Sequence, residues 1–335
     1  HCACVNNPNT GELLVEPFFF SNTKEGFELF LSSIKGYDNA LIGLEDTGHY
    51  GNNFLTFLLE NNLEVALVNP RSTKEFRKIM NWPAKNDKKD TILITHLLTL
   101  KNSYRLVSNQ STLTKELKEY TRRYHDKVED IARYKSRLQK AIDLVFPEYN
   151  DIFNTPYTNA YMNVLKHSGS AQDIASTDIR TIRNLIKNEG RGRPVTVSAE
   201  HLKESAKNSI GQHNEATVLE IKHLVALIEL LEDHVKGYKK KIEDFSHQLE
   251  SPIISIPGIS HISGMTILAE LGDINNFDSA SKLVSYAGVA PYTIQSGDYE
   301  VSKTSITKTG PSYLRKALYQ CCLSVTNNIP TFNSY

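Results

Sequence analysis

The first hundred residues alternate between two apolar patterns. Short apolar runs bounded by turn residues predict strands, and apolar residues spaced three and four apart predict helices between them. The predicted strands span residues 1–5, 13–20, 40–44 and 65–68, and the predicted helices span residues 23–35 and 53–61. Such alternation is typical of an α/β domain with a mostly parallel or mixed sheet, in which functional sites gather at strand ends.

Two long stretches carry a sustained helical period. Apolar residues recur every three or four positions over 113–145, where Phe146-Pro147 ends the pattern, and again over 218–249. Both resemble coiled-coil seams, which pair either as an antiparallel hairpin within one chain or between chains. The polar residues between them, 150–212, predict short helices. Within these, 191–194 (Arg-Gly-Arg-Pro) reads either as a plain linker or as a basic hinge that contacts nucleic acid.

A turn followed by a helix opens the C-terminal region. An apolar run stops at Pro257-Gly258, polar residues follow at Ser260 and His261, and a helical pattern then runs to Leu271. The unpaired amide groups and positive dipole of a helix N-terminus suit a phosphate ligand. The pattern is that of a helix-hairpin-helix gripping a nucleic-acid backbone, with Gly258 and Ser260 as contacts. An ordinary tight turn between helices explains it equally well.

Charge is balanced over the whole chain and uneven along it. The 335 residues carry 38 Lys and Arg against 38 Asp and Glu. Residues 1–100 carry 9 basic against 12 acidic side chains, residues 115–140 carry 9 against 5, and residues 301–335 carry 4 against none. An acidic head with a basic middle and tail fits a metal-dependent site joined to phosphate-binding surfaces, although solvated helix faces explain any single run.

Composition narrows the class of protein further. An apolar fraction of 40% indicates a globular protein with room for two or three domains, and no apolar run approaches membrane-spanning length. No signal peptide is recognisable, so we expect a cytoplasmic protein. The four cysteines come as Cys2 with Cys4 and Cys321 with Cys322, a poor zinc pattern that predicts reduced structural thiols.

Three carboxylates stand where a site is expected. Glu45 ends a predicted strand before a glycine turn, while Asp87 and Asp90 open a predicted helix that reaches Leu100. A spacing of three puts both aspartates on one helical face. Hard oxygen ligands in this number are what a magnesium (Mg²⁺) site for phosphoryl transfer requires. Alternatively, Glu45 is a turn residue and the aspartates are dipole-favoured acids of a helix start.

An ordered set of motifs follows in the tail. The motifs are IPGI at 256–259, AELGD at 269–273, YAGVAP at 286–291, Ser296-Gly297, and the run from Lys308 to Leu318 with its LRKAL ending. Taken together, they resemble the C-terminal domain of the bridge-RNA-guided DEDD transposases (recombinases) of bacterial insertion sequences. In the head, residues 43–48 and the set Lys85, Asp87 and Asp90 resemble the patterns that hold that family's second, third and fourth acids.

The resemblance implies a fold and a division into domains. Residues 1–105 are expected to form an α/β RNase H-like (RuvC-like) DEDD catalytic domain. The strand bearing the family's first Asp is not in the sequence, so this domain would lack its first strand and carry an unpaired edge. The chain resembles a family member truncated at the N-terminus and at the C-terminus. Residues 106–250 would be a helical coiled-coil region, and residues 251–335 a mainly α domain with the helix-hairpin-helix and the serine.

The resemblance also implies a mechanism and partners. Glu45, Asp87 and Asp90 would hold Mg²⁺, and Ser296 would attack a DNA phosphate to form a covalent serine–DNA intermediate. Nucleic acid would contact Gly258, Ser260, Lys303, Lys308 and Arg315. The expected partners are DNA, a guide (bridge) RNA encoded by the element and further copies of the chain, in a homo-oligomer (dimer or tetramer) formed through the coiled coil. The protein would act in the bacterial cytoplasm, at the nucleoid.

Two other functions remain open from the sequence. One is a metal-only, junction-resolving nuclease that uses the acids without a serine step. The other is a non-enzymatic nucleic-acid-binding remnant. Because Ser296 lies about 200 residues from the acids, one active site could also be built from two protomers.

Overall fold

The chain folds into two compact units, His1–Ser111 and Thr112–Tyr335. The computed structural model describes residues 1–37, 39–46, 48–82, 86–100, 103–107, 112–153, 155–187, 197–292, 295–296, 299–300 and 305–333. Within these residues, no helix is both long and apolar enough to cross a membrane. The four cysteines are free thiols, as the sequence predicted.

The first unit holds two small sheets. Strand β1 (Cys2–Asn6) pairs antiparallel with β2 (Leu13–Phe19). Strand β3 (Ile42–Glu45) pairs in parallel with β4 (Val65–Val68), and β5 (Tyr104–Leu106) adds antiparallel to β4. The helices are α1 (Lys24–Ile34), α2 (Asn52–Glu60) after the 3₁₀ helix η1 (Gly48–Gly51), α3 (Pro70–Ile79) and α4 (Asp87–Thr99).

The periodic patterns predicted β1 to β4 and the helices α1, α2 and α4 to within two residues, whereas α3 and β5 were not predicted; the mixed sheet is confirmed. Phe30 and Phe54 of the helices pack on Ile42 and Val65 of the strands, so α1 and α2 cover one face. Helix α4 contacts both sheets and buries Leu93. The first unit is therefore a layered α/β arrangement whose strands fall into two sheets.

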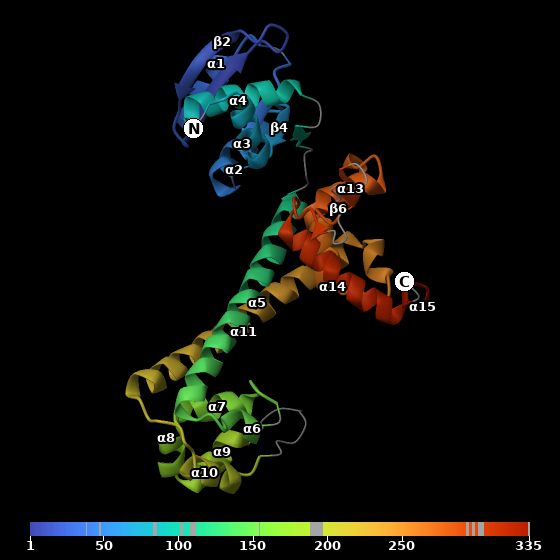
Figure 1. Ribbon diagram of the computed structural model, residues 1–335. Helices are drawn as coiled ribbons and strands as arrows, with labels where there is room; N and C mark the ends of the chain where they lie inside the picture. Colours follow the sequence, from blue (N-terminus) through green and yellow to red (C-terminus); the bar gives the residue numbers. More distant parts are fainter. Residues whose placement is uncertain are drawn as a thin grey trace. The chain divides into compact units, whose positions relative to one another are not determined.

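The second unit is organised around two long helices. Helix α5 (Thr112–Val145) and helix α11 (Glu215–Leu249) lie side by side and antiparallel (Figure 1). Ion pairs Lys135–Glu232 (2.7 Å) and Arg137–Glu220 (3.0 Å) cross between them. The apolar seams thus contact each other within the chain, which is one of the two pairings that the sequence left open. This pairing is possible because a folded segment returns the chain from the end of α5 to the start of α11. The coiled coil between chains that the resemblance implied stays a prediction.

That folded segment is a cluster of short helices, as the polar sequence predicted. The helices are α6 (Tyr149–Ile152), α7 (Asn159–His167), α8 (Ala171–Ser176), α9 (Ile179–Ile186) and α10 (Ala199–Lys207). They share one core with the ends of α5 and α11, in which the Tyr149 hydroxyl donates to the Tyr161 carbonyl (2.8 Å). The predicted basic hinge at 191–194 lies outside the described residues.

The C-terminal segments pack on the other end of the long helices (Figure 1). The helical segments are η2 (Pro252–Ser255), α12 (His261–Leu271), η3 (Ile274–Asn276), α13 (Ala280–Ala287), α14 (Ser312–Asn328) and α15 (Pro330–Asn333). The short strands are β6 (Pro291–Tyr292), β7 (Gln295–Ser296), β8 (Tyr299–Glu300) and β9 (Ser305–Ile306), paired as β6–β9 and β7–β8. Met265 and Ala269 of α12 are buried against Leu117, Ile242 and Phe245 of the long helices.

Candidate active site

The three predicted acids stand at element ends in the first unit. Glu45 is the last residue of β3, and Asp87 and Asp90 lie in the first turn of α4. The side chain of Asn86 caps that helix by accepting from the Lys88 amide (2.9 Å). Acids in a first turn are favoured by the helix dipole. The positions of Asp87 and Asp90 therefore stabilise the start of α4, whether or not these carboxylates also take part in catalysis.

Asp90 is engaged by a neighbouring helix. Its Oδ1 accepts from Arg77 Nη2 at 2.7 Å and from Arg77 Nε at 3.2 Å. Both side chains are mostly buried, 15% exposed for Asp90 and 17% for Arg77. A charge-assisted pair removed from water in this way ties α3 to α4. The sequence gave no sign of this partner, because Arg77 lies thirteen residues away on another helix.

Within the described residues, no three His, Cys, Asp or Glu side chains lie close enough together to hold a metal ion. Glu45, Asp87 and Asp90 therefore do not form the magnesium cluster expected from the sequence. The guanidinium of Arg77 pairs with Asp90, and the three carboxylates alone do not fit a metal site. We assign no chemical step to a metal at this position.

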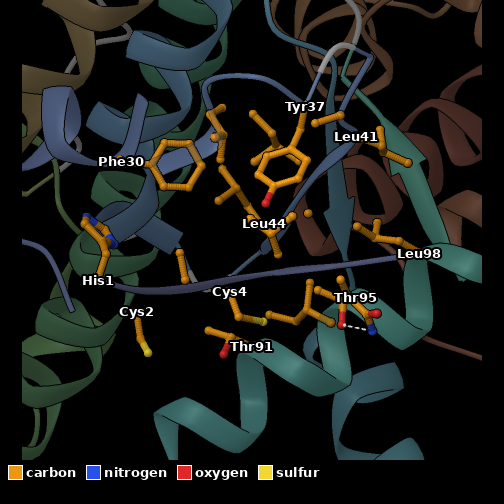
Figure 2. Close-up of a pocket in the computed structure, with 18 of the residues that line it drawn as sticks. His1, Cys2, Cys4, Phe30, Tyr37, Leu41, Leu44, Thr91, Thr95 and Leu98 are labelled. Carbon is orange, nitrogen blue, oxygen red and sulfur yellow. Dashed lines mark hydrogen bonds between the residues drawn. The ribbon is translucent and has the colours of Figure 1, made fainter. Parts of the chain in front are cut away.

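A large cavity of the first unit is bordered by strands of both sheets. Its volume is about 800 Å³. Its lining includes all of β1 and β3, together with Phe54 of α2. Phe30 of α1 and Leu98 of α4 also line it (Figure 2). Glu45 belongs to this lining. The sequence patterns did not reveal the cavity, because it arises from how the two sheets are placed.

Two thiols on β1 line the same cavity. Cys2 and Cys4 alternate along the strand and both lie near Thr91 of α4 (Figure 2). Burial raises the pKa of both thiols, and the nearby Asp87 carboxylate raises the pKa of Cys2 further. These cysteines are therefore protonated thiols at neutral pH rather than reactive thiolates.

The predicted nucleophile belongs to the second unit. Ser296 ends β7 and pairs with Tyr299 of β8, so it sits on a short hairpin. Its side chain lies outside the described residues, as do Gly297 and Lys303. The β6–β9 pair brackets this hairpin and connects it to α13 and α14.

Two predicted nucleic-acid contacts hold the ends of the segment that carries this hairpin. Arg315 Nη1 donates to the carbonyls of Ala287 (3.3 Å) and Gly310 (2.9 Å). The Lys308 amide donates to the Gly288 carbonyl at 2.9 Å. A Cβ on Gly310 would come within 1.8 Å of the Tyr286 carbonyl oxygen, so only glycine permits this approach. Arg315 and Lys308 thus fix the base of the serine-bearing segment.

The Pro257-Gly258 turn is packed rather than open. Gly258 has a φ of +95°, and a Cβ there would lie 2.8 Å from the Ser324 carbonyl carbon of α14. Ser260 caps α12 by accepting from the Ser263 amide at 3.2 Å. The segment before the turn is the short 3₁₀ helix η2 rather than an α-helix. The helix-hairpin-helix therefore stays a prediction, and the turn also docks α14.

A buried polar network joins α5 to the C-terminal segments. Glu270 of α12 has a fully buried side chain that accepts from Arg122 Nε (2.6 Å) and Nη2 (2.9 Å), with Lys118 Nζ at 3.6 Å. His125 bonds to Thr266 at 3.1 Å, and the Tyr313 hydroxyl donates to Asp126 at 2.5 Å. Helices α12 and α14 are therefore both fastened to α5 through polar contacts.

Most of the basic residues on α5 are engaged in such pairs. Seven of the nine Lys and Arg at 115–140 form ion pairs with carboxylates of the same chain: Lys118, Arg122, Arg123, Lys127, Arg133, Lys135 and Arg137. Four of these side chains, Lys118, Arg122, Lys135 and Arg137, reach carboxylates of other helices, and the other three pair with carboxylates of α5 itself. Contact between this helix and a nucleic-acid backbone stays a prediction.

Two family models match separate parts of the chain. Residues 1–147 match a transposase model of the DEDD type of IS110, and residues 250–335 match the model of the Transposase IS116/IS110/IS902 family. The first match covers the unit with the acids, and the second covers the segments that carry Ser296. Neither match extends into the helical cluster between α5 and α11.

Curated relatives agree with these matches. The pilin gene-inverting protein of Moraxella bovis is 30% identical over 118 residues, which cover 31% of this chain and only 37% of that relative. The corresponding protein of Moraxella lacunata gives the same identity and coverage. An uncharacterized 44.8 kDa protein of insertion element IS116 from Streptomyces clavuligerus is 22% identical over 290 residues, 78% of this chain and 72% of the relative.

Proposed function

The chain belongs to the IS116/IS110/IS902 family of transposases, and from that premise we propose that it cuts and rejoins DNA as the recombinase of a mobile element. The observation that carries the proposal is that one chain matches both the acid-bearing head and the serine-bearing tail of the same family, in order. Relatives named for inverting a pilin gene support a reaction in which DNA is cut and rejoined.

The first unit, which carries Glu45, Asp87 and Asp90, contributes the acids of the proposed site. A DEDD domain implies an RNase H-like fold and, in general, the use of a divalent metal ion. Magnesium remains our expectation for that ion. Because Glu45, Asp87 and Asp90 do not cluster in the described residues, the proposal gives these acids no metal-dependent step.

The tail supplies the proposed nucleophile. The Ser296 hydroxyl oxygen would attack a DNA phosphorus, forming an Oγ–P bond while the bond from phosphorus to the leaving deoxyribose oxygen breaks. The serine proton is lost to a base or solvent, and the leaving oxygen takes up a proton. The phosphoserine bond keeps the energy of the broken phosphodiester, so attack by another deoxyribose hydroxyl rejoins the DNA and releases the serine.

We also propose that a guide RNA encoded by the element selects the DNA. The resemblance to bridge-RNA-guided enzymes supports this, because such systems read sequence by base pairing rather than through side chains.

Assembly into a dimer or tetramer is part of the same proposal. The seam between α5 and α11 is filled within the chain, so a second copy would contact the outer face of α11. Leu219, Leu227 and Leu230 are exposed there. Light scattering of the purified chain would check this, and a strictly monomeric mass would count against it.

The covalent step offers the sharpest test of function. The protein is incubated with RNA of the element and a nicked DNA carrying the element's ends, and protein–DNA adducts are resolved by denaturing electrophoresis and mapped by mass spectrometry. We expect an adduct on Ser296 that is absent in Ser296→Ala. Ser305→Ala is the matched control, since Ser305 lies on β9 of the same segment and should leave the adduct unchanged.

Other outcomes decide between the remaining functions. Cleavage that persists in Ser296→Ala without an adduct would support a metal-only nuclease. DNA or RNA binding with neither cleavage nor adduct would support a nucleic-acid-binding protein without catalysis. The Arg77–Asp90 pair is the observation that keeps this alternative open, since Asp90 Oδ1 is engaged by a guanidinium in this structure.

A further inference from the structure

The basic side chains of the first hundred residues are concentrated in one stretch. Residues 70–90, which run from the start of α3 into the first turn of α4, carry 7 basic and 3 acidic side chains. The rest of residues 1–100 carry 2 basic against 9 acidic side chains. A basic stretch within an otherwise acidic unit directs a polyanionic ligand to that one place.

Most of the described cations in this stretch are not neutralised by carboxylates. Arg77 pairs with Asp90 at 2.7 Å, and Lys78 pairs with Glu75 at 3.1 Å. The other four form no ion pair with a carboxylate of the described residues: Arg71, Lys74, Lys88 and Lys89. These four side chains are therefore available to the phosphate groups of a ligand.

Two of the unpaired lysines lie over aromatic rings. Lys88 Nζ is 5.8 Å from the centre of the Phe19 ring, and Lys89 Nζ is 5.6 Å from the centre of the Trp82 ring. Phe19 is 57% exposed at the end of β2, and Trp82 is partly exposed. The start of α4 therefore has two accessible rings beside it, each with an ammonium group over it, and such contacts are weak at exposed sites.

The backbone holds Trp82 close to the predicted acids. Helix α3 ends in a Schellman turn, in which Asn81 has a φ of +51° and the Trp82 amide donates to the Arg77 carbonyl at 3.1 Å. The side chain of the same arginine binds Asp90. Trp82 is thus tied through Arg77 to the first turn of α4, where two of the predicted acids stand.

An indole covered by a weakly held ammonium group suits an unpaired nucleobase. Stacking of a base on an aromatic ring is stronger than an exposed cation–π contact, so a base can replace the Lys89 ammonium over Trp82. The displaced ammonium group can then pair with a phosphate of the same strand. A base inside a duplex is already stacked on both faces, so the ligand that fits this surface is a single strand.

From these observations we propose that Trp82, together with Lys89 and the neighbouring unpaired cations, forms a binding site for an unpaired DNA strand, one base of which stacks on the indole. The inference deepens the proposed function, on which the choice of DNA rests, because it places a single strand beside the acids of the first unit. Stacking on Trp82 requires neither Ser296 nor a metal ion.

Tryptophan fluorescence tests the proposal directly. Trp82 is the one tryptophan of the chain, so its emission reports on this site alone. The full chain is titrated with an oligothymidylate of about 12 nucleotides, within the range that single-strand binding sites cover. We expect saturable quenching of the emission. The matched control is an abasic strand with the same number of phosphates, which should bind at least roughly tenfold more weakly and leave the emission unchanged.

Variants separate stacking from charge when binding is measured by the anisotropy of a labelled strand. Trp82→Ala should weaken binding about tenfold, whereas Trp82→Phe, which keeps a ring, should stay within about threefold of wild type. Lys89→Gln should lower the slope of log affinity against log salt by about 0.7, the value for one phosphate contact on a single strand. Lys24→Gln is the matched control, since Lys24 is an exposed lysine on α1, and it should change neither quantity.

Four results would each overturn the proposal. Binding of oligothymidylate without quenching would place the strand elsewhere. Equal binding of the abasic strand would show contact with phosphates alone, and equal quenching by a duplex of the same length would show that unpaired bases are not selected. Binding of oligouridylate at least roughly tenfold tighter than oligothymidylate would identify the ligand as RNA. A Ser296–DNA adduct formed without quenching would refute this site and leave the proposed function intact, so the two failures are distinguishable.

Discussion

Replacing Arg122 with alanine is expected to destabilise the second unit by about 3 kcal/mol, because it strands a buried charge. The Glu270 carboxylate has no solvent-exposed side-chain surface and accepts two hydrogen bonds from Arg122, at 2.6 and 2.9 Å. Once Arg122 is removed, Lys118 at 3.6 Å is the cation that the structure leaves nearby. Loss of one partner of a buried pair costs about 3–5 kcal/mol, and the remaining lysine places this case at the lower end.

The same helix provides a matched control. Arg137 also pairs with a glutamate across to another helix, at 3.0 Å from Glu220, but its side chain is 62% exposed and that of Glu220 is 44% exposed. Exposed pairs contribute about 0–1 kcal/mol because water and salt screen them. Arg137→Ala should therefore cost no more than about 0.5 kcal/mol. The difference between the two arginines isolates burial as the cause.

A double replacement separates the charge from the packing. Arg122→Met combined with Glu270→Leu removes both charges and keeps apolar volume, and such exchanges are often neutral or stabilising. We expect the double variant to be more stable than Arg122→Ala by at least about 2 kcal/mol. Some loss relative to wild type is expected, because the Arg122 guanidinium also lies 5.3 Å from the centre of the Tyr313 ring.

Urea unfolding with two optical probes assigns the effect to a unit. The single tryptophan, Trp82, belongs to the first unit, whereas helices α5 and α11 of the second dominate the far-UV circular dichroism. The circular dichroism transition should shift in Arg122→Ala while the Trp82 transition stays in place. Equal destabilisation by Arg122→Ala and Arg137→Ala, or a double variant no more stable than the single one, would refute the reasoning.

Two further predictions concern the same unit. Burial and repulsion by Lys316 lower the pKa of His125 to about 4 in the fold; because the unfolded chain then binds more protons, stability should fall by up to about 3 kcal/mol as pH drops from 6.5 toward 4. His125→Gln should flatten that part of the pH profile measured by circular dichroism, and an unchanged profile would contradict a neutral buried His125. Gly258→Ala should destabilise by about 2 kcal/mol, because its positive φ and the approach of Ser324 exclude a Cβ. Gly237→Ala, in an open position on α11, should instead stabilise by about 0.5–1 kcal/mol, and equal effects at the two glycines would show that the packed turn is not rigid.

The periodic spacing of apolar residues was enough to predict most helices and strands, but it did not predict which elements pack against each other. Strands at 42–45 and 65–68 and the helix at 112–145 follow from local apolar spacing, which depends only on neighbouring residues. The pairing of the long helices does not, because an apolar seam fits a partner within the chain as well as one outside it. The ion pairs of α5 could not be predicted from local spacing either, since Arg122 pairs with Glu270, which lies far away in the sequence.

For the candidate site, the sequence likewise predicted the features that depend on local structure and missed those that depend on contacts between elements. The strand-end position of Glu45 and the first-turn positions of Asp87 and Asp90 could be predicted, because both depend on local structure. The pairing of Asp90 with Arg77 could not be predicted, and neither could the cavity, since both depend on contacts between separate elements. Arg315 was expected to bind nucleic acid, and the structure adds two backbone carbonyls that it holds.

The cavity of the first unit is lined by one of the three predicted acids. Glu45 lines it from β3, and Asp87 lies close enough to Cys2, on β1, to raise the pKa of that thiol. Asp87 itself belongs to the first turn of α4, so these two acids stand on different elements. Asp90, on the same helix, is held by Arg77 of α3 in a mostly buried pair. The separation of the three carboxylates is therefore set by contacts between elements, which no local pattern in the sequence encodes.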